Sequence, residues 1–224
     1  MPVYNEEATI GEIVGRVRAT GLPYEIIVVD DGSSDNSAAL LAALEESGQP
    51  PLRILRHEQN QGKGAAVRTG LAAVTGDLVL VQDADLEYDP ADYTVLLAPF
   101  DDPAVEVVYG SRNLGRNPRS SHAFYWGGRF LSWVTNRLYG ARITDEATGF
   151  KVFRTQLLKG LNLEGNGFEF CPEATGKILR RRIAIHEVPI SYSPRSWKEG
   201  KKIRWYDGLS ALWYLLKYRI LPGR

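Results

Sequence analysis

The chain has 224 residues, 44% of them hydrophobic and 24% charged, which is enough for one globular domain with a substantial core. Its 27 basic residues balance 27 acidic ones, so we predict no nucleic-acid partner. A single cysteine, Cys171, excludes an internal disulfide, and the N-terminus lacks the pattern of a secretory signal. No apolar run approaches the roughly 18 to 20 residues of a membrane span. We therefore predict a cytoplasmic protein whose membrane contact is peripheral.

Helical and strand signals alternate through the first half. Apolar residues at helical spacing over 10–17 follow Asn5, a good N-cap, and a buried strand is predicted over 25–29. Next come a helix at 38–45, a strand at 52–55, a helix through Val67, Leu71 and Val74, and a strand at 78–81. This alternation is typical of an α/β fold with a mostly parallel sheet covered by helices. Because residues 1–5 have a loop-like sequence, the first strand of the sheet is predicted to be missing.

The second half is less regular. We predict a strand at 105–109, a polar loop at 110–121, helices at about 124–138 and 168–181, and a strand at 184–188. No element is predicted for 144–153. A basic patch, Arg195, Lys198, Lys201, Lys202 and Arg204, precedes an aromatic amphipathic helix predicted over 205–224. We accordingly place one domain at 1–204 and a separate helix after it.

Two acidic clusters follow predicted strands, at the sheet edge where α/β proteins bind ligands. Asp83 and Asp85, with Glu87 two residues later, offer hard oxygen ligands for Mg²⁺ or Mn²⁺ beside a substrate diphosphate. Asp31 follows the strand at 25–29 and could accept hydrogen bonds from a nucleobase or ribose, while Asp35 caps the next helix. Turn and helix-cap chemistry alone could also account for both clusters.

These clusters belong to an ordered set of motifs. The set comprises Pro2-Val3-Tyr4-Asn5-Glu6-Glu7, Asp30 to Asp35, Asn60-Gln61-Gly62-Lys63-Gly64, Asp83-Ala84-Asp85, Gly110-Ser111-Arg112, Thr144 to Lys151, and Glu187-Val188-Pro189-Ile190 followed by Arg195. It resembles the family-2 glycosyltransferases of the GT-A fold, and among them the dolichyl-phosphate mannose synthase and polyprenyl-phosphate glucosyltransferase branch. The resemblance implies an inverting enzyme that moves a sugar from a nucleotide diphosphate sugar to a polyprenyl phosphate.

The resemblance also implies roles for single residues. Pro2, Tyr4, Glu6, Asp31 and Asp83 would bind the nucleotide sugar, Asp83, Asp85 and Glu87 the metal, and Arg112, Arg129 and Arg195 the phosphates. Arginine suits this task because its fixed fork of donors matches phosphate geometry. Glu87 stands where related enzymes often have glutamine.

Two residues are candidates for direct catalytic roles, Asp85 through the metal and Asp145 as a general base. A sugar-hydroxyl acceptor would need such a base, whereas a phosphate monoester, with a second pKa near 6, is already largely ionised at neutral pH. With a phosphate acceptor, Asp145 would orient the site. Three alternatives stay open: a glycosyltransferase of the same fold acting on a sugar hydroxyl of a polysaccharide or glycolipid, a nucleotidyltransferase, and a catalytically silent binding module.

The C-terminal segment is rich in aromatic residues. Trp205, Tyr206, Trp213, Tyr214 and Tyr218 follow the basic patch, a composition that suits a helix lying at the inner face of a membrane. Packing of the same helix against the domain, against a second copy or against a membrane-protein partner is the alternative.

Overall fold

In a computed structural model of the chain, the structure describes residues 1–22, 24–46, 52–118, 121–195, 202 and 204–221. Two lysines of the basic patch, Lys198 and Lys201, and the side chain of Trp205 lie outside this description. Every helix and strand predicted from the sequence is present, with ends shifted by a few residues.

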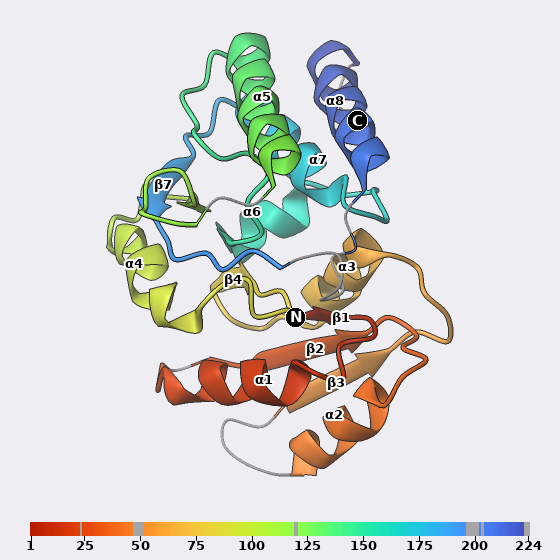
Figure 1. The fold of residues 1–224 in the computed structure, drawn as a ribbon. Helices are drawn as coiled ribbons and strands as arrows, with labels where there is room; N and C mark the ends of the chain where they lie inside the picture. The colour runs from red at the N-terminus through yellow and green to blue at the C-terminus, as the bar shows by residue number, and fades with distance from the viewer. Residues whose placement is uncertain (23, 47–51, 119–120, 196–201, 203, 222–224) are drawn as a thin grey trace.

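The N-terminal half is built on a parallel sheet of three strands. Strands β1 (Pro2–Val3), β2 (Ile26–Asp30) and β3 (Leu52–Arg56) lie in the order β1-β2-β3. Helices α1 (Ile10–Ala19) and α2 (Ser37–Glu46) lie on one side of this sheet and α3 (Lys63–Ala73) on the other (Figure 1). All five residues of β2 are buried, as its continuous apolar run predicts.

The prediction of a missing first strand is wrong, because Pro2 and Val3 pair in parallel with Val29 and Asp30. Two residues before a polar stretch are too few to give a strand pattern, but Val3 is buried in the core. The N-cap prediction for Asn5 is also wrong. Helix α1 is capped at Thr9, and Asn5, at a φ of 50°, accepts a hydrogen bond from the backbone N of Ser34 at 2.8 Å.

The second sheet contains an antiparallel strand that the sequence analysis did not predict. Strands β4 (Leu78–Val81), β6 (Lys151–Arg154), β5 (Val107–Ser111) and β7 (His186–Pro189) lie in the order β4-β6-β5-β7. Strand β6 runs antiparallel to β4 and β5, whereas β5 and β7 are parallel. One apolar core joins both sheets, since it contains Val28 of β2, Val108 of β5 and Val152 of β6. Side chains beyond β2 and β4 therefore come close together.

The remaining helices cover the second sheet and extend beyond it. They are η1 (Pro90–Asp92), α4 (Tyr93–Leu97), η2 (Ala98–Asp101), α5 (His122–Tyr139), α6 (Thr155–Gly160), α7 (Phe170–Arg180) and α8 (Trp205–Ile220). Helices α5, α7 and α8 form the end of the molecule opposite the three-stranded sheet (Figure 1). Among the described residues, no helix combines the length and apolar character needed to cross a bilayer. In the structure, α8 packs on α5 through Leu131 and Leu215. The domain boundary at residue 204 stays a prediction.

Candidate active site

Asp83 and Asp85 lie just beyond the end of β4, and each is paired with a basic side chain. The ammonium Nζ of Lys63 is 2.6 Å from Oδ1 of Asp83, and Nη2 of Arg195 is 3.0 Å from Oδ2 of Asp85. Gly149 makes room for Asp83, because a Cβ at this position would lie 2.6 Å from Oδ2 of the aspartate. Only glycine permits this close approach.

Glu6 completes the acidic cluster, which we define as Glu6, Asp83 and Asp85. Its carboxylate lies 3.1 Å from Nη1 of Arg195 and 2.6 Å from Nζ of Lys202. Arg195 thus joins Glu6 to Asp85, and side chains from three distant parts of the sequence meet. Burial, and next the charge of Asp83, raise the pKa of Asp85 to about 6, although Arg195 acts in the opposite direction. Burial thus makes the ionised form of Asp85 less favourable here than in water.

Lys63 reaches the cluster because of the backbone at the start of α3. Gly62 has a φ of 99°, and a Cβ there would lie 2.4 Å from the carbonyl oxygen of Asn166. Burial opposes the charge of Lys63, but its acidic neighbours, Asp83 foremost, raise its pKa to about 12. Lys63 therefore stays positively charged at neutral pH. Its place in the site was not predicted from the sequence.

Asp31 is buried and holds the loop that leads to Lys63. Its carboxylate accepts hydrogen bonds from the backbone N of Gln61 at 2.9 Å and of Gly62 at 2.8 Å. Nδ1 of His57 lies 2.6 Å from its Oδ1. Pro2 and Tyr4 lie on the neighbouring segment, where the ammonium of Lys202 is 5.6 Å from the centre of the Tyr4 ring. Nucleoside binding by these residues stays a prediction.

The carboxylate of Glu87 is bonded to the segment that contains Tyr192 and Arg195. It accepts hydrogen bonds from the hydroxyl of Tyr192 at 3.1 Å and from the backbone N of Arg195 at 2.8 Å. Glu87 thus anchors the segment that carries Arg195. Within the described ranges, no three His, Cys, Asp or Glu side chains are grouped so as to hold a metal ion. Metal binding by Asp83, Asp85 and Glu87 stays a prediction.

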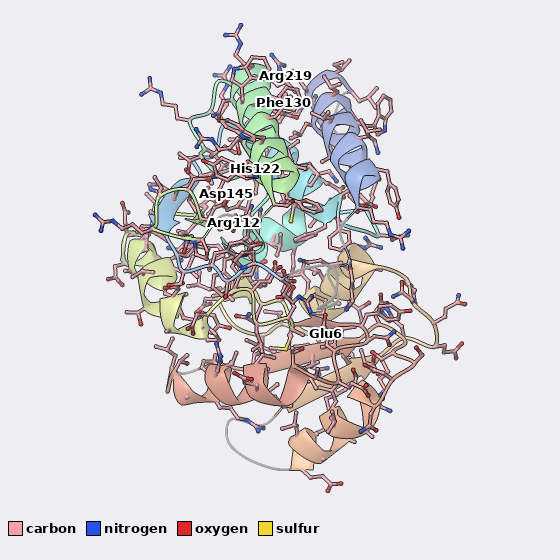
Figure 2. The ribbon with its side chains drawn as sticks, viewed as in Figure 1. Glu6, Arg112, His122, Phe130, Asp145 and Arg219 are labelled. Atoms are coloured by element: carbon pink, nitrogen blue, oxygen red, sulfur yellow. The ribbon has the colours of Figure 1, made fainter. Side chains whose placement is uncertain are left out.

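Arg112 and Asp145 form a bidentate ion pair, in which Asp145 is buried and Arg112 is partly exposed. Nε and Nη2 of Arg112 each lie 2.7 Å from a different oxygen of Asp145, and the backbone N of Arg112 adds a bond of 3.0 Å. The guanidinium also lies 5.0 Å from the centre of the Tyr192 ring. Figure 2 shows the two side chains together beside the start of α5.

The backbone around Asp145 is fixed as firmly as its side chain. Glu187 of β7 accepts hydrogen bonds from the backbone N of Thr144 at 2.7 Å and of Asp145 at 2.9 Å. Asp145 is only 1% exposed, so its carboxylate is shielded from solvent and already occupied. A general base must reach the proton that it removes, and both oxygens of Asp145 are bonded to Arg112 here. Whether Asp145 acts as a base or orients Arg112 stays a prediction. The local sequence around Glu187 does not predict this contact.

Two further residues of interest lie outside these contacts. Arg129 is exposed on α5, and within the described part of the chain no ion pair connects it to the acidic cluster. Its phosphate-binding role stays a prediction.

Glu146 is fully buried, and neither of its carboxylate oxygens has a hydrogen-bond partner among the described residues. Burial raises the pKa of Glu146, while the nearby ammonium of Lys151 acts to lower it.

Fold and site together define an α/β enzyme of the GT-A type, in which acids beyond strand ends face basic side chains across one site. The model of the family described as glycosyl transferase family 2 matches residues 1–161, and the chain belongs to this family. It is therefore a glycosyltransferase, which removes the nucleotidyltransferase and silent-module alternatives. The family resemblance carried by the ordered motifs is confirmed.

Similar proteins of known activity include one from the same branch. The chain is 28% identical to a dodecaprenyl-phosphate galacturonate synthase of Rhizobium johnstonii, over 100% of this chain and 68% of that protein. Among solved structures, glucosyl-3-phosphoglycerate synthase of Mycobacterium tuberculosis with uridine diphosphate has a TM-score of 0.75 at 21% identity, covering 99% of this chain and 79% of that one. The same enzyme with Mn²⁺, UDP-glucose and phosphoglyceric acid gives 0.74 at 22% identity, with 99% and 78% covered. At these identities the structures support the shared fold.

Proposed function

We propose that this glycosyltransferase moves a sugar from a UDP- or GDP-sugar to a polyprenyl phosphate, with inversion at the anomeric carbon. An oxygen of the acceptor phosphate forms the new bond to that carbon, the bond to the donor diphosphate breaks, and a nucleoside diphosphate leaves. The Rhizobium relative, named for a polyprenyl phosphate product, supports this acceptor class.

The donor side of the proposal rests on the acidic cluster. Asp83 and Asp85 fit Mg²⁺ or Mn²⁺, since such ions commonly use one or two carboxylates together with substrate phosphates. The raised pKa of Asp85 fits as well, because a nearby cation would relieve the crowded negative charge. A bound divalent cation would neutralise charge on the departing diphosphate. The complexes of the mycobacterial enzyme with Mn²⁺ and a uridine nucleotide support this assignment.

The basic side chains would change partners when the donor binds. Lys63 and Arg195 neutralise Asp83 and Asp85 in the free protein. With Asp83 and Asp85 holding a divalent cation, Lys63 and Arg195 would be free to donate hydrogen bonds to phosphate oxygens of the donor. Arg195 has a reason to do so, because its Nε is buried without a hydrogen-bond partner in the described structure.

The observation that carries the choice of acceptor is the Arg112–Asp145 pair. A hydroxyl acceptor needs a free carboxylate as base, but both oxygens of Asp145 are bonded to Arg112. A phosphate acceptor needs no base and benefits from a fixed guanidinium. Asp145 then acts as a positioning residue, and Arg112 faces the second anion of the reaction.

The test is a transfer assay with separate donor and acceptor panels. The protein is incubated with UDP- and GDP-sugars, Mn²⁺ or Mg²⁺, and one of three acceptors: a short-chain polyprenyl phosphate, the matching polyprenol, or a free oligosaccharide. Mass spectrometry then detects the glycolipid, and a coupled assay detects the nucleoside diphosphate. We expect transfer to the phosphate alone. Transfer to a hydroxyl acceptor in its place would reject the proposal.

A further inference from the structure

Two adjacent helices expose large apolar side chains in regular stripes. On α5, Trp126, Phe130 and Trp133 are 63%, 53% and 58% exposed, and their spacing puts them on one helical face. On α8 the exposed stripe consists of Leu209, Trp213, Leu216 and Ile220. Exposed apolar patches of this kind mark interaction surfaces. We call the two stripes together the aromatic face.

The opposite sides of the same helices are packed, so the exposed stripes are not simply an unfinished core. Leu131 of α5 packs with Ala211 and Leu215 of α8. The hydroxyl of Tyr218 donates to Oε1 of Glu173 at 2.7 Å, which ties α8 to α7. The aromatic residues of α8 lie on both sides of the helix: Tyr218 is buried, whereas Trp213 is exposed.

An arginine-lined cavity lies where α5, α7 and α8 end. Its volume is about 500 Å³, and Arg137, Arg180, Arg182 and Arg219 line it with no acidic residue among its walls. Arg180 donates to the carbonyl oxygen of Tyr218 at 3.1 Å, and Arg219 donates to that of Leu138 at 2.7 Å. These two arginines cap helix ends. The guanidinium groups of Arg137 and Arg182 have no hydrogen-bond or ion-pair partner in the described part of the chain.

We propose that the aromatic face docks on a bilayer and that the arginine cavity binds the phosphate of an anionic phospholipid. Tryptophan suits the depth of lipid headgroups, and arginines at the edge of such a face attract anionic lipid. Arg137 follows Trp126, Phe130 and Trp133 at helical spacing, so the α5 stripe leads directly to the cavity. Helices α5 and α8 contain four basic side chains and one acidic one, Asp207, which favours an anionic partner.

Docking through α5 would also bring the acceptor to the active site, a consequence that rests on the proposed function. The hydroxyl of Ser132 accepts a hydrogen bond from the backbone N of Glu146 at 3.0 Å, and Asn136 bonds the backbone of Ile143. The helix is thus fixed to the segment that carries Asp145. A membrane under α5 would hold polyprenyl phosphate beside Arg112.

The test is flotation of the full chain with phosphatidylcholine vesicles, with and without phosphatidylglycerol, at low and high salt. The cavity variant is Arg137→Gln with Arg182→Gln, and the face variant is Trp126→Ser with Trp133→Ser. Arg16→Gln with Arg53→Gln, on α1 and β3 at the other end of the molecule, is the charge-matched control (Figure 1). Thermal melting confirms that each variant is folded.

We expect the wild-type chain to prefer anionic vesicles and to lose this preference at high salt. The cavity variant should weaken binding to anionic vesicles at least about tenfold. The face variant should weaken binding to both kinds of vesicle, and the control should bind like the wild type. The salt comparison needs no substitution, so it stands even if a variant is unstable.

Several results would overturn the docking proposal. The first is that the wild-type chain binds neither kind of vesicle, and the second is that the cavity variant binds as well as the wild type. The third is that inorganic phosphate saturates the cavity but the chain does not bind vesicles. The fourth is that the chain does not bind vesicles but forms a dimer, which dissociates in the face variant. Turnover with a water-soluble short-chain polyprenyl phosphate is measured in parallel, without vesicles. If the wild type shows no turnover in this assay, the proposed function is rejected. The docking proposal is not affected by that result, because vesicle binding is measured independently.

Discussion

The acidic cluster and the Arg112–Asp145 pair lie in one site but are built in different ways. In the cluster, Glu6, Asp83 and Asp85 crowd together, and three separate cations contact them. The pair is a single bidentate bridge whose backbone is clamped by Glu187. The pKa of Asp85 is raised to about 6, which signals that its charge is poorly accommodated in the free protein.

This difference separates a part that changes on binding from a part that is already in place. The ammonium of Lys63 and the guanidinium of Arg195 could exchange these carboxylates for the phosphate oxygens of a diphosphate, because both groups bind either kind of anion. Opening the bidentate pair would leave the buried carboxylate of Asp145 without its partner charge. We therefore assign ligand exchange to the cluster and orientation to the pair, and the following predictions test that division.

The largest effect is expected in the cluster. Asp85→Asn, and separately Asp83→Asn, should lower turnover about a thousandfold or more, because each removes a charged ligand of the proposed metal. The measurement is release of nucleoside diphosphate in the presence of polyprenyl phosphate. Asp101→Asn, at an exposed position of η2, is the matched control and should keep normal turnover. If Asp85→Asn kept a tenth of the activity, the cluster would not be the metal site.

Arg112 should come next. Arg112→Lys retains the charge but cannot form the two parallel bonds to Asp145, so kcat/KM for the acceptor should fall about 10- to 100-fold. The KM of the donor should change little, because Arg112 is assigned to the acceptor phosphate. Steady-state kinetics with each substrate varied in turn measures the two effects. An effect confined to the donor KM would show that Arg112 acts on the donor and not on the acceptor phosphate.

Asp145→Asn should be milder in turnover than either cluster variant, with a loss of about tenfold, because the residue acts through Arg112. The substitution should also lower the free energy of unfolding by about 2 to 4 kcal/mol, because Arg112 would lose its buried partner. Denaturant unfolding measures this. In combination with Arg112→Lys the two losses should be clearly less than additive. An Asp145→Asn variant as inactive as Asp85→Asn would favour the general-base role and a hydroxyl acceptor.

The smallest effect is predicted for Glu146, next to the pair. Its pKa is raised by burial, so at neutral pH the ionised group is better solvated in the unfolded chain than in the folded one. This penalty is present above the folded-state pKa and disappears as the pH falls toward the unfolded value. Glu146→Gln should therefore equal or exceed the wild type in stability at pH 7, by up to about 1 kcal/mol, with the advantage shrinking in acid.

Thermal melts of both proteins over a pH series would measure that trend. A Glu146→Gln variant that is strongly destabilised at pH 7 would instead show that the ionised carboxylate supports the fold, and the buried region beside Asp145 would need a different account.

Much of the fold follows from patterns that local physics makes visible. The continuously apolar strands and the helices with apolar residues at helical spacing, such as α1, were predicted to within a few residues. Two strands were not predicted, for opposite reasons. Strand β1 is too short to show a pattern, and β6 begins with Lys151, a buried lysine whose ammonium is satisfied by the carbonyl oxygens of Glu146 and Thr148.

The sequence predicts which types of residue form the site, but not which side chains pair with one another. Acids at strand ends were recognisable from Asp83 and Asp85, because chain order places them at the ligand-binding edge. The partners Lys63 and Glu187 could not be found this way, since their contacts cross long sequence separations. The bond between Glu87 and Tyr192 shows the same limit, because it follows a turn at Leu86, with a φ of 60°, and joins residues far apart in the sequence.

The most direct test of the account is calorimetric titration of UDP and of GDP into the wild-type chain and into Asp83→Asn and Asp85→Asn, with and without Mn²⁺. We predict that one nucleotide binds the wild type in a Mn²⁺-dependent manner and that both variants lose the dependence. Nucleotide binding of equal strength without the metal, or in both variants, would contradict the assignment of the acidic cluster as the metal and diphosphate site.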